Sequence, residues 1–221
     1  MSKKTFWLIS LIFTILFLLY SVMDYYGYIR YYKVCGTSMN KLLENYKNVD
    51  KYDKNKVVVI LGIKNYDNIS GLEKCIKSIL NQNIRIDEIG INIPYKEIGK
   101  IPGDLKKIVS IHSYSKDCDQ NDLVYTLLRE PEKNTKIIII NYLRFFGYDY
   151  LQNFIDESNK EENSIISMDE NGKYVGNILI KPEFFSNVKS EKGICESMET
   201  WLRKYSKNNI HYTSYKDNFN L

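Results

Sequence analysis

The chain has 221 residues, and its 31 basic and 27 acidic side chains give a net charge of +4. The basic residues form no dense stripe along the sequence, which argues against a nucleic-acid-binding surface. The four cysteines (Cys35, Cys75, Cys118 and Cys195) make neither a C-x-x-C motif nor a Cys/His cluster, which argues against a structural metal site.

An apolar run occupies residues 6–23, and no charged residue falls between Lys4 and Asp24. As a helix it would measure about 27 Å, which is enough to cross the hydrocarbon core of a bilayer. A cleaved signal peptide and a buried helix of a soluble protein are the alternatives. The apolar region of a signal peptide is shorter, roughly 7–15 residues, and ends at a small-residue cleavage site that is absent here. We therefore predict an uncleaved transmembrane anchor over residues 5–23, after a tail of residues 1–4.

The charges that flank this run bear on its orientation. Lys3 and Lys4 precede it, whereas Asp24, Arg30 and Lys33 follow it. The positive-inside rule favours a cytoplasmic N-terminus. The C-terminal domain is then expected in the lumen of the secretory pathway (ER or Golgi) or in another extracytoplasmic space, and a cytoplasmic domain is the alternative.

Residues 24–55 are polar and rich in tyrosine, and they predict a stem between membrane and domain, with a short helix over residues 39–46. The remaining residues, 56–221, are enough for one globular domain with a sizeable core.

Within this domain, short apolar runs alternate with amphipathic segments. Residues 57–61 are apolar without interruption, which is typical of a strand buried on both faces. Ser70 and Glu73 have capping-box spacing at the start of a helix that reaches residue 82. Further strands are predicted at 89–93, 108–112, 136–140, 164–168 and 174–180, and further helices at 123–129, 148–158 and 194–205. This alternation predicts an α/β fold with a mostly parallel, Rossmann-like sheet flanked by helices.

In such sheets, ligands bind beyond the carboxyl ends of the strands. The segments that follow Leu61, Ile93, His112 and Ile140 are therefore the expected binding loops.

The order of segments resembles a family of glycosyltransferases with the GT-A fold, found in bacteria, protists and large DNA viruses. Residues 57–82 form a strand, a loop and a helix that ends in the phrase Ser-Ile-Leu-Asn-Gln at 78–82. The segment 87–96, an Ile-Pro pair at 101–102 and a Lys-Ile-Val strand follow in the order seen in that family. The resemblance covers about residues 57–213, and the ordered series carries it rather than any single motif.

This resemblance implies a type II membrane protein that transfers a sugar from a nucleotide-sugar to a glycan or protein acceptor. It also implies a divalent ion, Mn²⁺ or Mg²⁺, held by an Asp-x-Asp triplet after a core strand, because a metal ion can offset the charge of the diphosphate leaving group. The positions that the resemblance assigns to donor binding are Lys64, Asn65, Asn92 and Asn141. Lys64 and Asn65 are also ordinary residues for a loop.

The sequence departs from the family at the metal triplet, whose position holds Asn141, Tyr142 and Leu143 without a carboxylate. A second family phrase, Asp-Tyr-Gly-Pro-Ala-Thr-Lys, retains only its first residue. That residue, Asp117, forms a literal Asp-x-Asp with Asp119 after a predicted strand. The pair is a candidate metal site, and a solvated acidic loop or a helix cap is the alternative.

The helix predicted at 194–205 resembles the family's Asp-Asp-x-Trp helix, with Glu199 at the second acid and Trp201 at the aromatic residue. The resemblance makes Glu199 a candidate general base that would deprotonate the acceptor hydroxyl. An ordinary surface glutamate is the alternative, because an apolar stripe along the same helix is typical of core packing.

Three hypotheses therefore stand. The protein is an active membrane-anchored glycosyltransferase, a catalytically inactive relative that serves as a binding or assembly subunit, or a structural membrane protein that shares only the fold.

Overall fold

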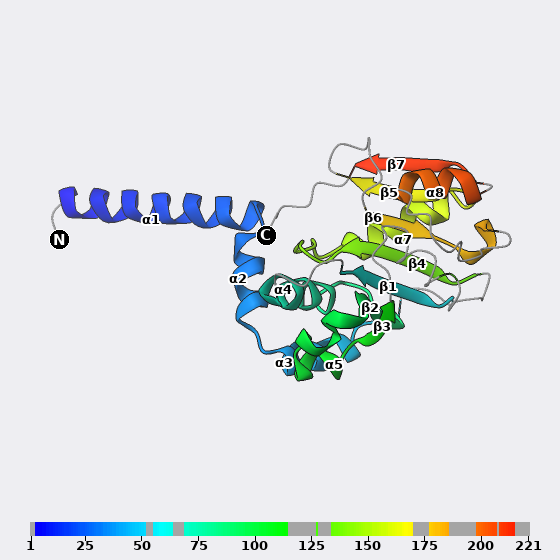
Figure 1. The fold of residues 1–221 in the computed structure, drawn as a ribbon. Coiled ribbons are helices and arrows are strands. Elements are labelled where there is room, and N and C mark those ends of the chain that lie inside the picture. Colours follow the sequence, from blue (N-terminus) through cyan, green and yellow to red (C-terminus); the bar gives the residue numbers. More distant parts are fainter. Residues whose placement is uncertain are drawn as a thin grey trace.

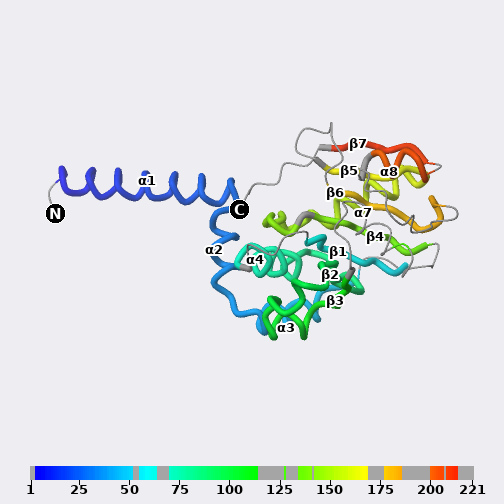
Figure 2. Tube along the Cα trace, viewed as in Figure 1, coloured from blue at the N-terminus to red at the C-terminus, as the bar shows by residue number. Residues whose placement is uncertain are grey.

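The computed structural model describes residues 3–51, 55–63, 69–114, 127, 134–169, 177–185, 198–206 and 208–214. These residues contain a seven-stranded sheet with the order β3-β2-β1-β4-β6-β5-β7, which Figures 1 and 2 show from one border to the other. Among the described strands, only β6 runs against its neighbours. The strands are β1 (Val57–Gly62), β2 (Glu88–Pro94), β3 (Ser110–Tyr114), β4 (Lys136–Asn141), β5 (Ile165–Asp169), β6 (Asn177–Ile180) and β7 (Ile210–Ser214).

Helices cover both faces of this sheet. The α-helices are α1 (Lys3–Tyr25), α2 (Tyr28–Gly36), α3 (Met39–Lys47), α4 (Ile69–Ile79), α5 (Gly103–Lys106), α7 (Tyr150–Lys160) and α8 (Met198–Tyr205), and the 3-10 helices are η1 (Tyr95–Lys100) and η2 (Pro182–Phe184). The first apolar cluster packs one face of the sheet against α2, α3, α4, α5 and α7. The second apolar cluster packs the opposite face against α8. The predicted mostly parallel α/β fold is confirmed.

Strand β1 shows why the uninterrupted apolar runs form the centre of the sheet. Val57, Val59 and Leu61 belong to the first cluster, whereas Val58 and Ile60 belong to the second. Successive side chains of a strand point to opposite faces, so a run that is apolar at every position fits a strand covered on both sides.

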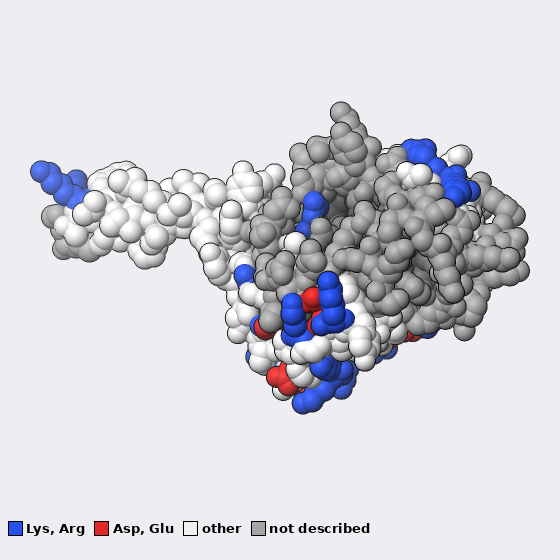
Figure 3. Space-filling model, in the orientation of Figure 1, with Lys and Arg blue, Asp and Glu red and all other residues white. Residues whose placement is uncertain are grey.

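Helix α1 extends away from the sheet, and none of its residues is buried (Figure 1). It has 23 residues and contains an 18-residue stretch with a mean hydropathy of 2.4, so it is long and apolar enough to cross a membrane. Figure 3 shows basic side chains at its free end, and the face in view carries no charged side chain along the rest of the helix. Gly27, with a φ of 74° in the left-handed region, makes the turn into α2.

The segment predicted as a stem contributes to the core. Val34 of α2 and Leu42 and Tyr46 of α3 are buried in the first apolar cluster. The Tyr46 hydroxyl accepts a hydrogen bond of 2.7 Å from the backbone N–H of Ile86, and burial raises the pKa of Tyr46 to about 12. Helix α3 confirms the short helix predicted there, and both helices pack against the domain.

Two differences from the predicted elements have structural causes. Strand β3 begins at Ser110 rather than at Ile108, because the N–H groups of Ile108 and Val109 both donate to the carbonyl of Leu105 in the turn after α5. Strand β7 was not predicted, and it is defined by its pairing with β5. The predicted helix at 123–129 lies outside the described residues except for position 127.

Close packing at Gly90 of β2 gives a test of this fold. A Cβ atom at Gly90 would lie 2.6 Å from Cδ1 of Ile60 in the neighbouring strand. Gly90→Ala should therefore lower the free energy of unfolding by about 1–3 kcal/mol, the usual cost of overpacking a core. Urea denaturation of the full chain in detergent measures this change. Gly99→Ala is the matched control, because nothing lies within 4 Å of its added Cβ; equal effects of the two substitutions would contradict the packing.

Candidate functional site at the carboxyl edge of the sheet

The strand register places three polar residues and a glycine in one row at the carboxyl edge of the sheet. Gly62 of β1 is paired with Asn92 of β2 on one side and with Asn141 of β4 on the other. Asn92 is paired in turn with His112 of β3. The structure thus brings two of the predicted donor-binding positions, Asn92 and Asn141, to either side of a glycine that has no side chain.

The other predicted site residues are only partly described. Lys64, Asn65, Asp117 and Asp119 lie outside the described residues, and the roles assigned to them stay predictions. The backbone of Glu199 lies in the first turn of α8, on the sheet face that carries the second apolar cluster, and its side chain is outside the description.

The direction of α8 bears on where Glu199 lies. Ser206, directly after this helix, forms a bridge with Phe185, which follows β6. Because β6 runs against its neighbours, its end lies at the amino edge of the other strands. Helix α8 therefore ends near the amino edge, and Glu199 stands at the opposite end of the helix.

The triplet position after β4 has no acidic side chain that could bind a metal ion. Tyr142 is 8% exposed and belongs to the first apolar cluster, while Leu143 is exposed. Within the described parts of the chain, no group of three or more His, Cys, Asp or Glu residues could hold a metal ion. These residues do not fit a carboxylate-bound Mn²⁺ or Mg²⁺, so such an ion would need carboxylates from another segment, for which Asp117 and Asp119 are the predicted pair.

The loop after β4, residues 142–149, is held by the end of helix α4. The Phe146 N–H donates to Oγ of Ser78 at 3.2 Å, and Nε2 of Gln82 donates to the Gly147 carbonyl at 2.6 Å. Oε1 of Gln82 accepts a hydrogen bond of 3.1 Å from the Leu151 N–H. Two residues of the Ser-Ile-Leu-Asn-Gln phrase therefore fix the loop at the candidate site, a role that the sequence did not reveal.

Arg30 of α2 ties the same loop to the N-terminal helices. Its Nη1 donates to the Phe146 carbonyl at 2.6 Å, and its Nε and Nη2 donate to Oδ1 and the carbonyl of Asn81 at 3.0 and 3.2 Å. The guanidinium carbon lies 5.0 Å from the ring centroid of Phe145 and 5.9 Å from that of Tyr148. A planar guanidinium suits such combined hydrogen bonding and stacking, so Arg30 joins α2, α4 and this loop.

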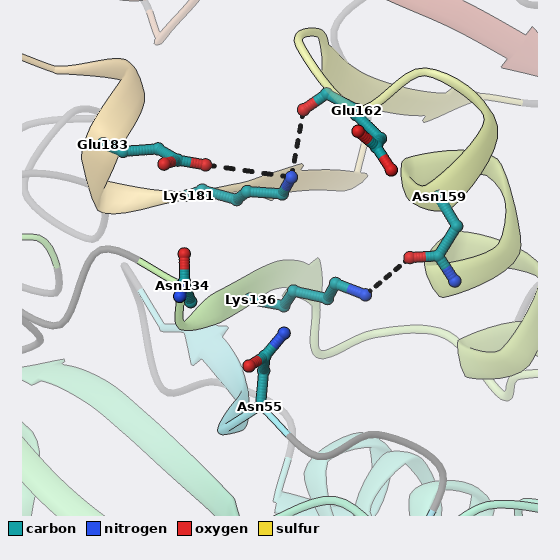
Figure 4. A pocket seen from close by; sticks show the side chains of 7 residues that line it. All are labelled: Asn55, Asn134, Lys136, Asn159, Glu162, Lys181 and Glu183. Carbon is teal, nitrogen blue, oxygen red and sulfur yellow. Dashed lines mark hydrogen bonds and ion pairs between the residues drawn. The ribbon is translucent and has the colours of Figure 1, made fainter.

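A polar cavity of about 620 Å³ lies at the opposite, amino edge of the sheet (Figure 4). The pairing of Ile137 with Ile180 places Lys136 and Lys181 on facing positions of β4 and the end of β6. Figure 4 shows both lysine side chains extending toward the end of α7. The cavity is lined by Asn55, Asn134, Lys136, Asn159, Glu162, Lys181 and Glu183.

Hydrogen bonds and acidic neighbours allow the two lysines to lie together, although facing like charges repel. Lys136 Nζ donates to Oδ1 of Asn159 at 2.8 Å, and Lys181 Nζ donates to the Glu162 carbonyl at 3.0 Å. Oε1 of Glu183 lies 3.8 Å from Lys181 Nζ. Sequence reasoning missed this cavity because its residues come from four separate segments of the chain.

The role of Gln82 can be tested by substitution. Gln82→Leu would leave the Gly147 carbonyl and the Leu151 N–H without their buried partner, and the free energy of unfolding should fall by about 2–4 kcal/mol. Chemical denaturation measures this loss. Gln152→Leu is the control, because the Gln152 amide bonds only Asp156 on its own helix among the described contacts, and it should change stability by less than about 0.5 kcal/mol. A loss for Gln82→Leu as small as the control's would contradict the role.

Comparisons with known proteins support the fold. No protein-family model matches the chain, and neither does any curated protein. Among solved structures, it is similar to a 4-diphosphocytidyl-2C-methyl-D-erythritol synthase, with a TM-score of 0.53 and 10% identity over 76% of this chain and 93% of the synthase. The synthase of the same name from Anaerococcus prevotii gives a TM-score of 0.54 and 11% identity over 76% of this chain and 89% of the other. Rv0371c from Mycobacterium tuberculosis gives a TM-score of 0.50 and 9% identity over 74% of this chain and 90% of Rv0371c. The chain therefore has the GT-A-like, mostly parallel α/β fold of these proteins.

Proposed function

We propose that this chain is a membrane-anchored, glycosyltransferase-like protein that binds a nucleotide-sugar at the carboxyl edge of its sheet and transfers the sugar to a glycan or protein acceptor. One observation carries the proposal: Asn92 and Asn141 flank Gly62 at the carboxyl ends of three adjacent parallel strands. This edge is where open α/β sheets bind their ligands. Carboxamide groups both donate and accept hydrogen bonds, as a sugar or a nucleotide base requires.

The proposed reaction forms one bond and breaks one bond at the anomeric carbon of the sugar. An acceptor hydroxyl oxygen bonds to that carbon, the bond from that carbon to the diphosphate oxygen breaks, and the nucleoside diphosphate leaves with the bonding electrons. Glu199 is the proposed base that takes the hydroxyl proton. Asp117 and Asp119 are the proposed ligands of the Mn²⁺ or Mg²⁺ ion that would offset the diphosphate charge.

The structural neighbours add a ligand class to this proposal. Two of them are named as synthases of a diphosphocytidyl compound, which is a nucleotide diphosphate ester. A nucleotide at the carboxyl edge is compatible with that name. Cytidine nucleotides therefore belong among the ligands to test, beside uridine- and guanosine-based nucleotide-sugars.

A second candidate function rests on the triplet position after β4. Tyr142 is buried among apolar side chains where a transferase of the resembled family would hold a carboxylate. A site that lacks its metal ligands loses most of the charge stabilisation that the leaving group needs. On this proposal the chain binds a nucleotide-sugar without transferring the sugar and serves as a binding or assembly subunit.

Binding and transfer can be measured separately. Calorimetry of the full chain in detergent, with a panel of nucleotide-sugars and CTP and with or without Mn²⁺, should show saturable binding. Asn92→Ala should weaken that binding by about 3–10-fold, the value of one hydrogen bond. Asn134→Ala, at the amino edge, should leave the binding unchanged.

Each result of that panel decides between the hypotheses. Binding with transfer to an acceptor supports the active enzyme. Binding without transfer supports the inactive relative. The lack of any binding would overturn both and leave a structural membrane protein.

Substituting aspartate at positions 142 and 143 tests whether the triplet position can accommodate the carboxylates of the resembled family. Tyr142→Asp would remove a buried ring and place a carboxylate in the apolar cluster, which should lower the free energy of unfolding by about 3 kcal/mol or more. Leu143 is exposed, so Leu143→Asp should change stability by less than about 0.5 kcal/mol. Thermal unfolding of the two variants measures the difference. A Tyr142→Asp variant as stable as the parent would mean that the metal triplet can be restored without repacking the core.

A further inference from the structure

The candidate anchor helix leaves the domain beside the carboxyl edge. Helix α1 ends at Tyr25, and only Tyr26 and Gly27 separate it from α2. Arg30, five residues beyond Tyr25, donates to the carbonyl of Phe146 in the loop after β4. Five residues span at most about 18 Å. The backbone of Arg30 therefore lies within that distance of the end of the apolar helix, and its side chain reaches the loop after β4.

The direction of the strands gives the same geometry. In Figure 1 the arrowheads of β1, β5 and β7 point toward the side of the domain from which α1 extends. The carboxyl edge therefore faces the candidate membrane helix, and the polar cavity of the amino edge faces away from it. If α1 crosses a bilayer, the carboxyl edge is directed at the bilayer surface.

Contacts between α2 and the domain preserve this orientation. The three hydrogen bonds of Arg30 fix α2 to the end of α4 and to the loop after β4. Tyr31 packs edge-to-face on Phe145, with their ring centroids 5.0 Å apart. Lys77 Nζ donates to the carbonyl of Cys35 at 2.9 Å. Because α2 is held along its length, the turn at Gly27 is the place where the domain can tilt relative to α1.

Exposed apolar side chains concentrate on the same edge. Outside α1, α2 and the turn between them, the large hydrophobic side chains that the described residues expose are Tyr95, Leu143 and Tyr148, which are 74%, 37% and 54% exposed. Tyr95 directly follows β2, and the other two lie in the loop after β4. Tyrosine is enriched where a protein meets the head groups of a bilayer, since its ring is apolar and its hydroxyl can hydrogen-bond to water.

The end of the candidate anchor carries the same kind of side chain. Tyr25, Tyr26, Tyr28 and Tyr32 are all exposed around the junction of α1 and α2. Aromatic residues at the end of a transmembrane helix mark the level of the membrane interface. Two groups of exposed aromatic residues, far apart in the sequence, thus lie on the side of the domain that faces α1.

We propose that the carboxyl edge rests on the bilayer surface through Tyr95, Leu143 and Tyr148, and that the acceptor of the reaction is carried on a membrane lipid. The second half rests on the proposed transfer function. A glycan on a lipid head group already lies at the level of this edge, whereas a soluble protein acceptor would have to enter between the domain and the bilayer. The hydroxyl oxygen of the lipid-borne acceptor then bonds to the anomeric carbon of the sugar, and the nucleoside diphosphate leaves as in the reaction proposed above.

Photo-cross-linking tests the contact with lipid without requiring activity. The full chain is reconstituted in phosphatidylcholine vesicles that contain a fluorescent phosphatidylcholine, with p-benzoylphenylalanine at position 148 or 95. Position 134, exposed at the amino edge, is the negative control, and position 13 in α1 is the positive control. Positions 148 and 95 should label the lipid several-fold more than position 134. Labelling at 148 and 95 no greater than at 134, with position 13 labelled, would overturn the proposal.

A longer tether supplies a matched control. A Gly/Ser insertion of about 20 residues between Tyr26 and Gly27 would let the domain move roughly 25 Å from the end of α1. Labelling at position 148 should then fall toward that at position 134. Binding of the nucleotide-sugar should stay the same, because the contacts of α2 and Arg30 are retained. Unchanged labelling would show that the contact does not depend on the short tether, contrary to the proposal.

The acceptor is tested with the same two proteins. Transfer to a glycolipid in the vesicles should exceed transfer to the same glycan free or on a soluble protein, and the insertion should reduce only the first. Equal or greater transfer to the soluble acceptors, or no transfer to the glycolipid although the nucleotide-sugar binds, would overturn the lipid acceptor. If no nucleotide-sugar binds, the proposed function and the proposed lipid-borne acceptor are both overturned. The cross-linking result still decides whether the carboxyl edge contacts the bilayer.

Discussion

The hydrogen bonds that hold the loop after β4 connect the main parts of this structure. Ser78 and Gln82 hold the loop from the end of α4, and Arg30 holds it from α2. Gln82 is buried, and so is its hydrogen bond with the Leu151 N–H, which has no other partner among the described contacts to replace it. Through these contacts the loop next to the candidate site is fixed to α2, and α2 follows the candidate membrane anchor after the turn at Gly27.

The two edges of the sheet differ in their chemistry. The carboxyl edge carries a row of backbone-paired polar positions around Gly62, with exposed aromatic residues in the adjoining loops. The amino edge carries a cavity lined by lysine, glutamate and asparagine side chains. The two edges are not equivalent, because the loops that follow the parallel strands gather at one edge and the loops that precede them gather at the other. The edge that faces α1 is also the edge on which ligands of such folds bind.

The likeness to the diphosphocytidyl-methylerythritol synthases and the resemblance to glycosyltransferases indicate the same architecture. Neither of them determines which reaction the site catalyses. One fold can carry many reactions, so the residues around the bound ligand decide the function. Here Tyr142 and Leu143 replace acidic residues that the resemblance leads one to expect. The burial of Tyr142 shows that this replacement is integrated into the core, and any metal-dependent chemistry would need carboxylates from another segment.

The sequence by itself determined the features that depend on local pattern. The uninterrupted apolar runs of β1 and β4 were recognisable because a strand that is buried on both faces is apolar at every position. The apolar length of α1 was recognisable because a helix that crosses a bilayer needs about 20 apolar residues. Only the tertiary structure decided the features that depend on distant partners. Strand β7 is defined by its pairing with β5, and α2 and α3 became part of the core because Arg30 and Tyr46 find partners more than thirty residues away. The cavity at the amino edge and the row across Asn92, Gly62 and Asn141 exist for the same reason, since strand register is set by contacts between segments that no local pattern records.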